Sequence, residues 1–478
     1  MRKYLRCGVM LAILSAPLLA SAQESQFQAE VRREGERVSD ACNFSFSAIP
    51  GCAYELFTDH PFHVAAGSMP PQNGFGLGAA FVWSKNTKDW RLSWDFDAVG
   101  ATSSAWRAGG YMTIVHNPHT EKNRIKVIHP QPDGSPQAQQ PSPPPKASLD
   151  FTHPDTVYNV YAQSISLNKV FFFGLGNDST LAEKSVYGMT QTIVGASAIK
   201  PIYEWPAIRK LNLSLLGEIN GRFVDIREVP GQGFPLIGTL FTDATAPGLT
   251  NQPGFFQLGE GLRIKPVFGN FELNYMGKFQ QYFAPSDSHS SFLRWTVDLS
   301  HTYYLYGHTN GSAENIGPDS CASSRDACPP IPHTRNLGGS LAFRLFLSES
   351  INSATSAVPF YFQQTLGGQD IDSNLALGSY QDYRFRAPNV LLLQESFEHS
   401  IWGPFGLKIM ADQGKVELNR GDIDFSDLKH SFAAGLTLRA GAFPMVTLMY
   451  AWGGPEGQHT IFNMNTSLLG GGGRPSLF

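Results

Sequence analysis

Four cysteines carry the clearest chemical prediction in the sequence. Cys42 and Cys52 form one near pair and Cys321 and Cys328 form another, while Cys7 lies in the N-terminal segment that we expect to be removed. An even number of cysteines in an oxidising compartment is typical of disulfide bonds. Zinc is the alternative, but neither pair has C-x-x-C spacing and no histidine cluster accompanies them. We therefore predict the disulfides Cys42–Cys52 and Cys321–Cys328, and no metal.

Histidines and catalytic motifs give weaker signals. His60 and His63 stand at i, i+3 in an extended, Pro-rich stretch, which favours a plug or turn role over a metal site. The chain has no G-x-S-x-G, H-E-x-x-H or P-loop motif. His301 and His399 would suit the lipid-facing rim of an outer-membrane lipase or deacylase, although an interfacial polar residue is also ordinary there. The sequence therefore favours a structural or transport protein over an enzyme, and it predicts no cofactor.

The first 22 residues predict where the chain is sent. The segment "MRKYLRCGVMLAILSAPLLASAQ" begins with basic residues, continues with a short apolar run and ends on Ala20-Ser21-Ala22. This order is typical of a secretory signal peptide, and the apolar run is too short to span a bilayer as a helix. We expect a mature chain from Gln23 that is exported across a bacterial inner membrane.

Composition narrows the class of fold. The chain has 478 residues, of which 16% are charged and 12% aromatic, and its net charge is −4. About 25% charged residues is usual for soluble proteins, and a net negative chain has no basic footprint for nucleic acid. Mean hydropathy is nevertheless only −0.18. A membrane β-barrel reconciles these values, because its alternating strands hide their hydrophobicity from a running average.

Alternation supports this interpretation along most of the chain. In "FELNYMGKFQQYF" (271–283) every second residue is mostly apolar or aromatic, and the interleaved residues are mostly polar. Successive side chains of a strand point to opposite faces, so one face is built for an apolar medium. A large soluble all-β protein would also alternate. Aromatic residues at strand ends and charges of both signs on the polar faces favour an antiparallel transmembrane barrel, with lipid outside and a lumen inside.

Counting the alternating segments gives about sixteen strands. They are expected at 74–85, 89–101, 104–116, 155–168, 183–199, 208–226, 255–267, 269–284, 290–306, 335–349, 358–365, 386–401, 404–416, 429–441, 443–453 and 458–468. We therefore predict a barrel over 73–478, preceded by an N-terminal periplasmic or plug segment over 23–72 that includes a short polar helix. The count also places the long connection 227–254 on the periplasmic side, against the rule that long loops lie outside.

Two sequence blocks resemble one family of such barrels. "FFFGLGNDST" (171–180), followed by "SVYGMTQTIVG", and "LGSYQDYRFRAPNVLLLQESFEHSIWGPFGLKIMADQGKV" (377–416) are similar to the BamA/TamA-like bacterial surface antigen superfamily. The resemblance implies a sixteen-stranded outer-membrane barrel whose loop six follows the eleventh strand, where the strand list also places 366–385. Only about fifty residues separate Gln23 from the first expected strand, whereas each periplasmic POTRA domain of the family needs about 75. The chain thus resembles members without POTRA domains.

The resemblance also implies a lock between loop six and the barrel wall. The family's loop-six arginine, which reaches toward an acidic wall residue, is replaced by Gly378 in Leu377-Gly378-Ser379-Tyr380. The wall motif survives as Asp412 and Gly414. We expect Asp412 to point inward and Arg384 or Arg386 to supply its partner charge, because an unpaired buried carboxylate is costly. The alternative is that both arginines lie at a wet loop root and pair with nothing.

The implied function is assistance in protein insertion or export through a seam between the first and last strands. Its implied partners are outer-membrane lipid and either an unfolded or secreted protein substrate or a separate periplasmic protein. A passive pore or surface-structural barrel is the alternative, and a lipid-acting enzyme is a more distant one.

Overall fold

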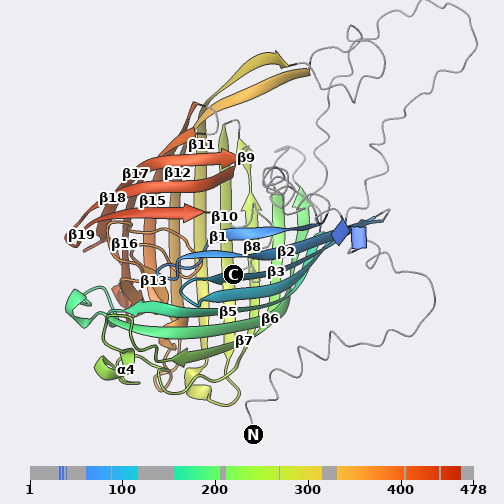
Figure 1. The fold of residues 1–478 in the computed structure, drawn as a ribbon. Coiled ribbons are helices and arrows are strands. Elements are labelled where there is room, and N and C mark those ends of the chain that lie inside the picture. Colours follow the sequence, from blue (N-terminus) through green and yellow to red (C-terminus); the bar gives the residue numbers. More distant parts are fainter. Residues whose placement is uncertain are drawn as a thin grey trace, which may run out of the picture. The chain divides into compact units, whose positions relative to one another are not determined.

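A computed structural model describes residues 61–87, 89–116, 156–204, 212–268, 270–314, 331–402, 405–440 and 443–464, together with five helical residues between Arg32 and Ser39. The chain divides into two compact units, Met1–Phe62 and His63–Phe478. The helical residues of the first unit lie within the polar segment where the sequence predicted a short helix. The second unit contains the sheet (Figure 1). Among the described residues, no helix is long and apolar enough to cross a membrane.

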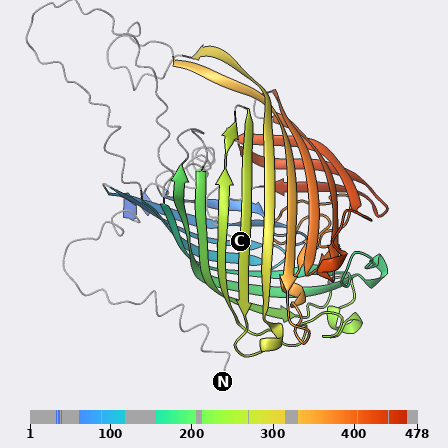
Figure 2. The same cartoon turned by 180° about the vertical axis from the view of Figure 1, so that it is seen from behind.

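The second unit is built from antiparallel strands that pair in chain order. The strands of the large sheet are β1 (Phe62–Ser68), β2 (Phe75–Asn86), β3 (Trp90–Ala101), β4 (Trp106–His116), β5 (Thr156–Phe172), β6 (Ser185–Glu204), β7 (Asn212–Arg227), β8 (Phe255–Lys265), β9 (Val267–Phe268), β10 (Phe271–Phe283), β11 (Phe292–Glu314), β12 (Ile331–Ile351), β15 (Asn389–Trp402), β16 (Phe405–Glu417), β17 (Lys429–Ala440), β18 (Phe443–Gly454) and β19 (Gly457–Met464). β8 and β9 together pair with β10 as one wall strand. The result is a nearly closed barrel of sixteen strands, which confirms the predicted fold class (Figures 1 and 2).

Most wall strands present their apolar set outward, as the alternation predicted. Phe96 is 49% exposed while the next residue, Asp97, is 5% exposed. Ile219 and Phe223 are likewise exposed on β7, while Glu218 and Arg222 beside them are buried. The strand "FELNYMGKFQQYF" is β10, with Gln280 buried inside and Phe271 and Phe283 exposed outside. The outer surface of the barrel is therefore apolar and aromatic, which is what contact with lipid requires.

Two predictions of the strand list are wrong, and they cancel. Residues 358–365 are not a wall strand, because Phe360–Phe362 form a 3₁₀ turn and β13 (Gln364–Leu366) pairs only with β14 (Phe385–Ala387) in a separate small sheet. The sequence missed β1, whose stretch "FHVAAGS" has no polar and apolar alternation. Loop six, 352–388, therefore still follows the eleventh wall strand.

The revised count also corrects the predicted position of 227–254. This connection, which carries α4 (Ile237–Leu240), follows the seventh strand, β7, and not an even one. In an antiparallel barrel, connections after odd-numbered strands share one end, so 228–254 and 352–388 lie at the same end. We call it the loop end. β11 and β12 extend beyond their neighbours at the opposite end, since the β12–β15 ladder stops at Gly339 (Figure 1).

Candidate functional site

A packed apolar cluster fills the loop end of the barrel. It joins inward-facing strand residues to residues of the connections at this end, and we call the connecting segments in it the plug. The plug comprises Phe173, Ile237, Phe241, Ala246, Val358, Phe360, Phe362 and Tyr383, all less than 9% exposed. They pack on wall residues from Leu167 and Tyr187 round to Phe255, Tyr282 and Phe292. Such a cluster excludes water, because protein interiors leave few voids larger than a water molecule.

Loop six supplies the aromatic centre of the plug. Phe360 is fully buried, and its ring lies 5.2 Å from Phe172 and 5.3 Å from Tyr187 in edge-on contacts. Phe362 makes the same kind of contact with Phe255, at 4.8 Å. Edge-on aromatic pairs are favourable beyond the area they bury. The segment misread as a strand therefore binds loop six to the wall at β5, β6 and β8.

The two sequence blocks that carried the family resemblance meet in this region. The amide N–H of Gly176 donates to the carbonyl of Arg386 at 2.8 Å. Gly174 and Gly176 both have positive φ, which allows the chain after Phe173 to turn toward loop six. The first block therefore contacts the second block near Arg386, where loop six ends. Neither block indicates this contact by itself.

The arginines of loop six do not bind Asp412, and this part of the lock prediction is wrong. Arg384 forms a buried ion pair with Glu456 of the β18–β19 turn at 2.5 Å, and it donates to the Ser179 hydroxyl and carbonyl at 2.7 and 2.6 Å. Its guanidinium also lies over the Phe173 and Phe385 rings. Arg384 therefore ties loop six to two other connections of the loop end.

Arg386 binds the plug in a different way. Its side chain is 4% exposed and donates to the carbonyl of Phe360 at 2.8 Å and to the Tyr187 hydroxyl at 3.4 Å. The alternative of a wet, unpaired loop root is therefore wrong as well. Both arginines are buried and hydrogen-bonded. They bind the plug and the neighbouring connections and do not bind Asp412.

Asp412 contacts the tip of loop six, residues 377–380, through neutral donors. Its side chain points inward and is 3% exposed. The amide N–H of Leu377 donates to one carboxylate oxygen at 2.9 Å, and the side-chain amide of Gln394 donates to the other at 3.3 Å. Next along the tip, the amide N–H of Ser379 donates to the Ser431 hydroxyl at 2.8 Å. Main-chain donors thus take the place of the family's guanidinium.

Close packing explains why the tip has glycine where the family has arginine. A Cβ on Gly378 would lie 2.9 Å from Ile461 Cδ1 and 3.2 Å from the Cβ of Ala451, so a long side chain does not fit there. Tyr380 is buried against the Phe385 ring at 5.1 Å. A Cβ on Gly414 would lie 3.0 Å from Leu366 Cδ1, so loop six approaches the wall closely at Gly414. The tip lies almost flush with the wall.

A polar network connects this tip to the charged lumen. Gln394 bridges Asp412 and Arg344, whose guanidinium donates to it at 3.1 Å. Arg344 in turn holds Asp298 through two bonds of 2.9 Å. Sequence reasoning missed Arg344 and Gln394, although both lie in predicted strands. It could not supply the cross-strand register that aligns Arg344 with Gln394 and Gln394 with Asp412.

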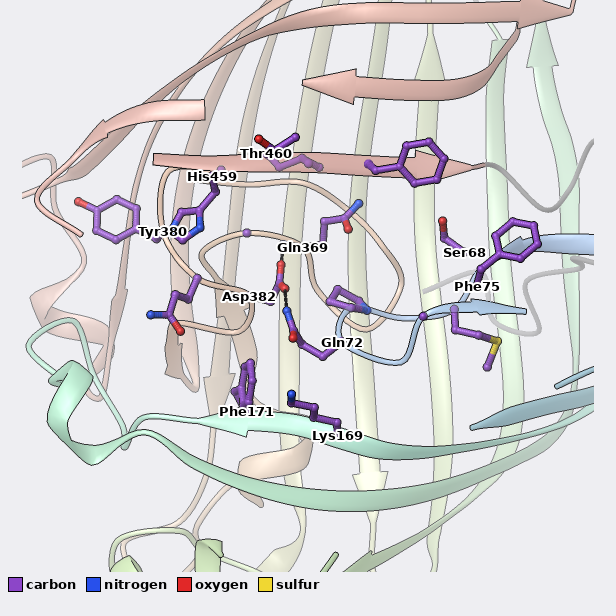
Figure 3. A pocket seen from close by; sticks show the side chains of 18 of the residues that line it. Ser68, Gln72, Phe75, Lys169, Phe171, Gln369, Tyr380, Asp382, His459 and Thr460 are labelled. Atoms are coloured by element: carbon purple, nitrogen blue, oxygen red, sulfur yellow. Dashed lines mark hydrogen bonds between the residues drawn. The ribbon is translucent and has the colours of Figure 1, made fainter. Parts of the chain in front are cut away.

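The seam of the wall lies between β1 and β19, its first and last strands. Among the described residues, no backbone ladder joins these strands, and the hydrogen bond across the seam runs from the amide N–H of Met464 to the Ser68 hydroxyl at 3.1 Å. Beyond this contact, toward the loop end, a cavity of about 660 Å³ opens between β19, the β1–β2 turn and loop six (Figure 3). The Gln72 amide donates to Asp382 across it at 2.7 Å.

The predicted disulfide and metal positions can be followed only in part. Cys42, Cys52, Cys321, Cys328 and His60 lie outside the described residues. His63 is buried, and the described part of the chain holds no group of three or more metal-binding side chains.

The two histidines of the enzyme alternative contact aromatic residues. The ring of His301 lies 2.8 Å from the Tyr275 hydroxyl, and the ring of His399 stacks 6.4 Å from that of Phe397. These contacts are ordinary for interfacial histidines, and they give the enzyme alternative no support.

Comparison with solved structures returns outer-membrane barrels. The chain is similar to CdiB from Acinetobacter baumannii (10% identity, TM-score 0.46, covering 84% of this chain and 59% of that one) and to CdiB from Escherichia coli (10%, 0.47, 85% and 62%). It is also similar to BamA from Haemophilus ducreyi lacking POTRA domains 1–3 (11%, 0.44, 84% and 70%). The chain spans about three fifths of the CdiB chains. No family model matches it, and neither does any curated protein.

These likenesses concern the fold. CdiB and BamA belong to the superfamily that the two sequence blocks resemble.

Proposed function

We propose that this protein is an outer-membrane barrel that assists the insertion or export of other proteins through the seam between β1 and β19. The observation that carries the proposal is the seam itself. Among the described residues, each neighbouring pair of wall strands from β2 to β19 is joined by an antiparallel ladder, whereas the seam has one side-chain hydrogen bond, between Met464 and Ser68. A single such bond contributes only about 0.5–1.5 kcal/mol. The seam is therefore the place where a protein segment can enter the wall at least cost.

Location and orientation follow from the sequence and the surface. A signal peptide at 1–22 would export the chain, and the apolar outer face supports a location in the outer membrane. Because outer-membrane barrels carry their long loops outside, we assign the loop end to the cell surface. The segment before β1, 23–61, is then assigned to the periplasm, while 62–72 belong to β1 and the β1–β2 turn. Lipid and an unfolded or secreted protein substrate, with or without a separate periplasmic partner, are the proposed partners.

The plug argues against the alternative of a passive pore. Aromatic contacts join loop six to β5, β6 and β8, while its tip is bound to β16 and β17. An ion crossing the barrel would have to displace these segments. A surface-structural barrel would keep the plug but would have no use for a weak seam.

A disulfide across the seam tests the proposal. Ser68→Cys and Met464→Cys would be combined in a background where Cys42, Cys52, Cys321 and Cys328 are serine, because these two residues are in direct contact across the seam. The measurement is the folding rate of a urea-denatured eight-stranded barrel into vesicles that contain the protein. Oxidation should lower this rate to that of empty vesicles, and reduction should restore it.

A matched control closes a ladder that is already paired. Ala433→Cys with Ala451→Cys joins β17 to β18 at directly opposed positions, so its oxidation should leave the rate unchanged. Full acceleration with the seam oxidised would refute the seam as the route. A wild type that conducts steadily in planar bilayers and accelerates no folding would support the passive pore instead.

A further inference from the structure

The seam cavity reaches both sides of the barrel wall. It is lined by Ile461, which faces inward and is 9% exposed, and by the next residue, Phe462, which faces outward and is 55% exposed. Phe75 at the start of β2 is also in the lining and is 47% exposed. Consecutive side chains of a strand point to opposite faces, so a cavity that touches both borders the open edge of β19. The cavity is thus open to the lipid-facing surface at the loop end.

Two lysines occupy its inner wall. Lys169 of β5 and Lys184, directly before β6, both lie over the Phe171 ring, at 5.4 and 3.8 Å from its centre. They also lie over the Phe234 ring, at 5.3 and 4.3 Å. Neither lysine takes part in an ion pair within the described chain. Two ammonium groups are therefore held around the same pair of rings without a carboxylate bound to either.

The electrostatics of this arrangement are unfavourable as it stands. Burial and the neighbouring charge of Lys169 lower the pKa of Lys184, and Asp382 offsets this only in part. The Asp382 carboxylate already accepts from the Gln72 amide and from the Gln369 amide N–H, at 2.7 and 2.9 Å. An added anion between the lysines would remove the repulsion.

A further polar group in the lining is left unsatisfied. The Nε2 atom of His459 is buried and has no hydrogen-bond partner in the described structure. A buried polar atom without a partner costs free energy that a bound acceptor or donor would recover. His459 lies on β19, across the cavity from Lys169 (Figure 3), so polar groups face the cavity from two sides.

We propose that the seam cavity binds the phosphate-bearing headgroup of an anionic lipid from the outer leaflet. The two lysines hold the phosphate, since lysine binds phosphate as a point charge, and Lys184 keeps its bond to Gln381. The acyl chains lie along the outward side chains of Phe75 and Phe462. A lipid is favoured over an acidic peptide because the cavity opens beside a surface that faces hydrocarbon. The proposal depends on the membrane location and not on protein insertion through the seam.

Binding of diphosphoryl lipid A by the full-length protein in detergent tests this site. Native mass spectrometry would compare wild type with Lys169→Gln/Lys184→Gln and with Lys85→Gln/Lys200→Gln, which removes the same charge near the opposite end of β2 and β6. The first variant should bind at least tenfold more weakly and the control as wild type. Heat-modifiable migration in gels would show that each barrel is folded. If the double lysine variant does not fold, the single variant Lys169→Gln replaces it and should weaken binding severalfold.

One altered ligand and two competitors identify the source of the phosphate. Dephosphorylated lipid A should bind as weakly to wild type as lipid A binds to the double variant. Inorganic phosphate or a poly-glutamate peptide that displaces lipid A at equal concentration would overturn the lipid assignment, the first in favour of a free ion and the second in favour of a protein segment. Undiminished binding of lipid A by the folded lysine variant would overturn the site itself.

Discussion

The inward faces of the strands change character between the loop end and the middle of the barrel. At the loop end, the first residues of β11 and the last of β10 are aromatic, and Tyr282 and Phe292 stack at 4.4 Å beneath the plug. Six residues further along β11, roughly 20 Å deeper, Asp298 pairs with Arg344. The same strand thus presents an aromatic ring inward beneath the plug and an ion pair inward deeper in the barrel, with Arg294 between them bound to the carbonyl of Phe362.

This difference shows what decides the inward face. Outward residues meet the same medium along the strand, so most of them are apolar, although exceptions such as Glu260 and Glu395 occur. Inward residues meet either packed protein or a polar lumen, where the Tyr161 hydroxyl binds Glu218 and Arg344 binds Asp298. The plug and the lumen can therefore be disturbed separately, and the predictions below use that separation.

The largest effect is expected from Phe360→Ala, which empties the centre of the plug. Phe360 is fully buried between Phe172 and Tyr187, and truncation of such a residue costs about 3–5 kcal/mol. Urea unfolding in vesicles should show this loss, and protease access to loop six should rise. The control Phe223→Ala removes a ring that is 55% exposed on the outer face, so it should cost clearly less. Equal losses would show that the plug is not a packed core.

How far the sequence predicts this molecule follows from the same contrast. Wall strands such as β10 were predictable because lipid on one side and lumen on the other impose alternation. β1 was missed because "FHVAAGS" is made largely of small residues and both of its faces are mostly covered. Phe360 and Phe362 lie in a 3₁₀ turn and are both buried, so their spacing in the sequence resembles that of a strand. The search for alternating residues therefore assigned this part of the plug to the wall.

The site was predictable in part for a related reason. The inward position of Asp412 and its contact with the tip of loop six follow from one strand and one motif. The partners of Arg384 depend on which turns meet at the loop end, and Ser179 and Glu456 are far from it in the sequence. Nothing local to Arg384 indicates either contact.

A somewhat smaller or equal loss is expected from Arg384→Ala. The change leaves Glu456 buried without its partner, at a cost of about 3–5 kcal/mol if the pair stays dry. The double variant Arg384→Ala/Glu456→Gln should lose much less free energy of unfolding than the sum of the two single losses, because the two residues share one contact.

The same variant distinguishes the observed anchors from the predicted lock. Arg384→Ala and Asp412→Ala have no shared partner, so their effects on the free energy of unfolding should add to within about 0.5 kcal/mol. Strong coupling between the two substitutions would instead support the Arg384–Asp412 ion pair that the sequence suggested.

Asp412→Ala alone should have an intermediate effect. It leaves the buried amide N–H of Leu377 and one donor of Gln394 unsatisfied, which costs about 1–3 kcal/mol. Protease cleavage within 366–385 should increase, while the plug contacts of Phe360 should hold the rest of loop six in place. Asp412→Asn keeps an acceptor for Leu377 and should lose less. If Asn and Ala behave alike, the hydrogen bond to Leu377 does not hold the tip.

The smallest effect concerns the connection 418–428, which belongs to neither the plug nor the lumen. The Asp424 carboxylate accepts from the Ser426 hydroxyl at 2.7 Å and from the Lys415 ammonium at 3.0 Å, and these bonds hold the pKa of Asp424 at about 2. A carboxyl whose pKa is lowered on folding stabilises the folded form above its unfolded pKa, and this contribution fades as pH falls through the folded value. A spin label introduced by Phe425→Cys, at a side chain that is 70% exposed, should therefore stay ordered at pH 5 and gain mobility between about pH 4 and pH 2. Asp424→Asn should give the mobile spectrum at every pH. Asp427→Asn, which leaves both bonds intact, should titrate like wild type, and a spectrum of wild type that does not change down to pH 2 would show that the Lys415–Asp424 contact does not order this connection.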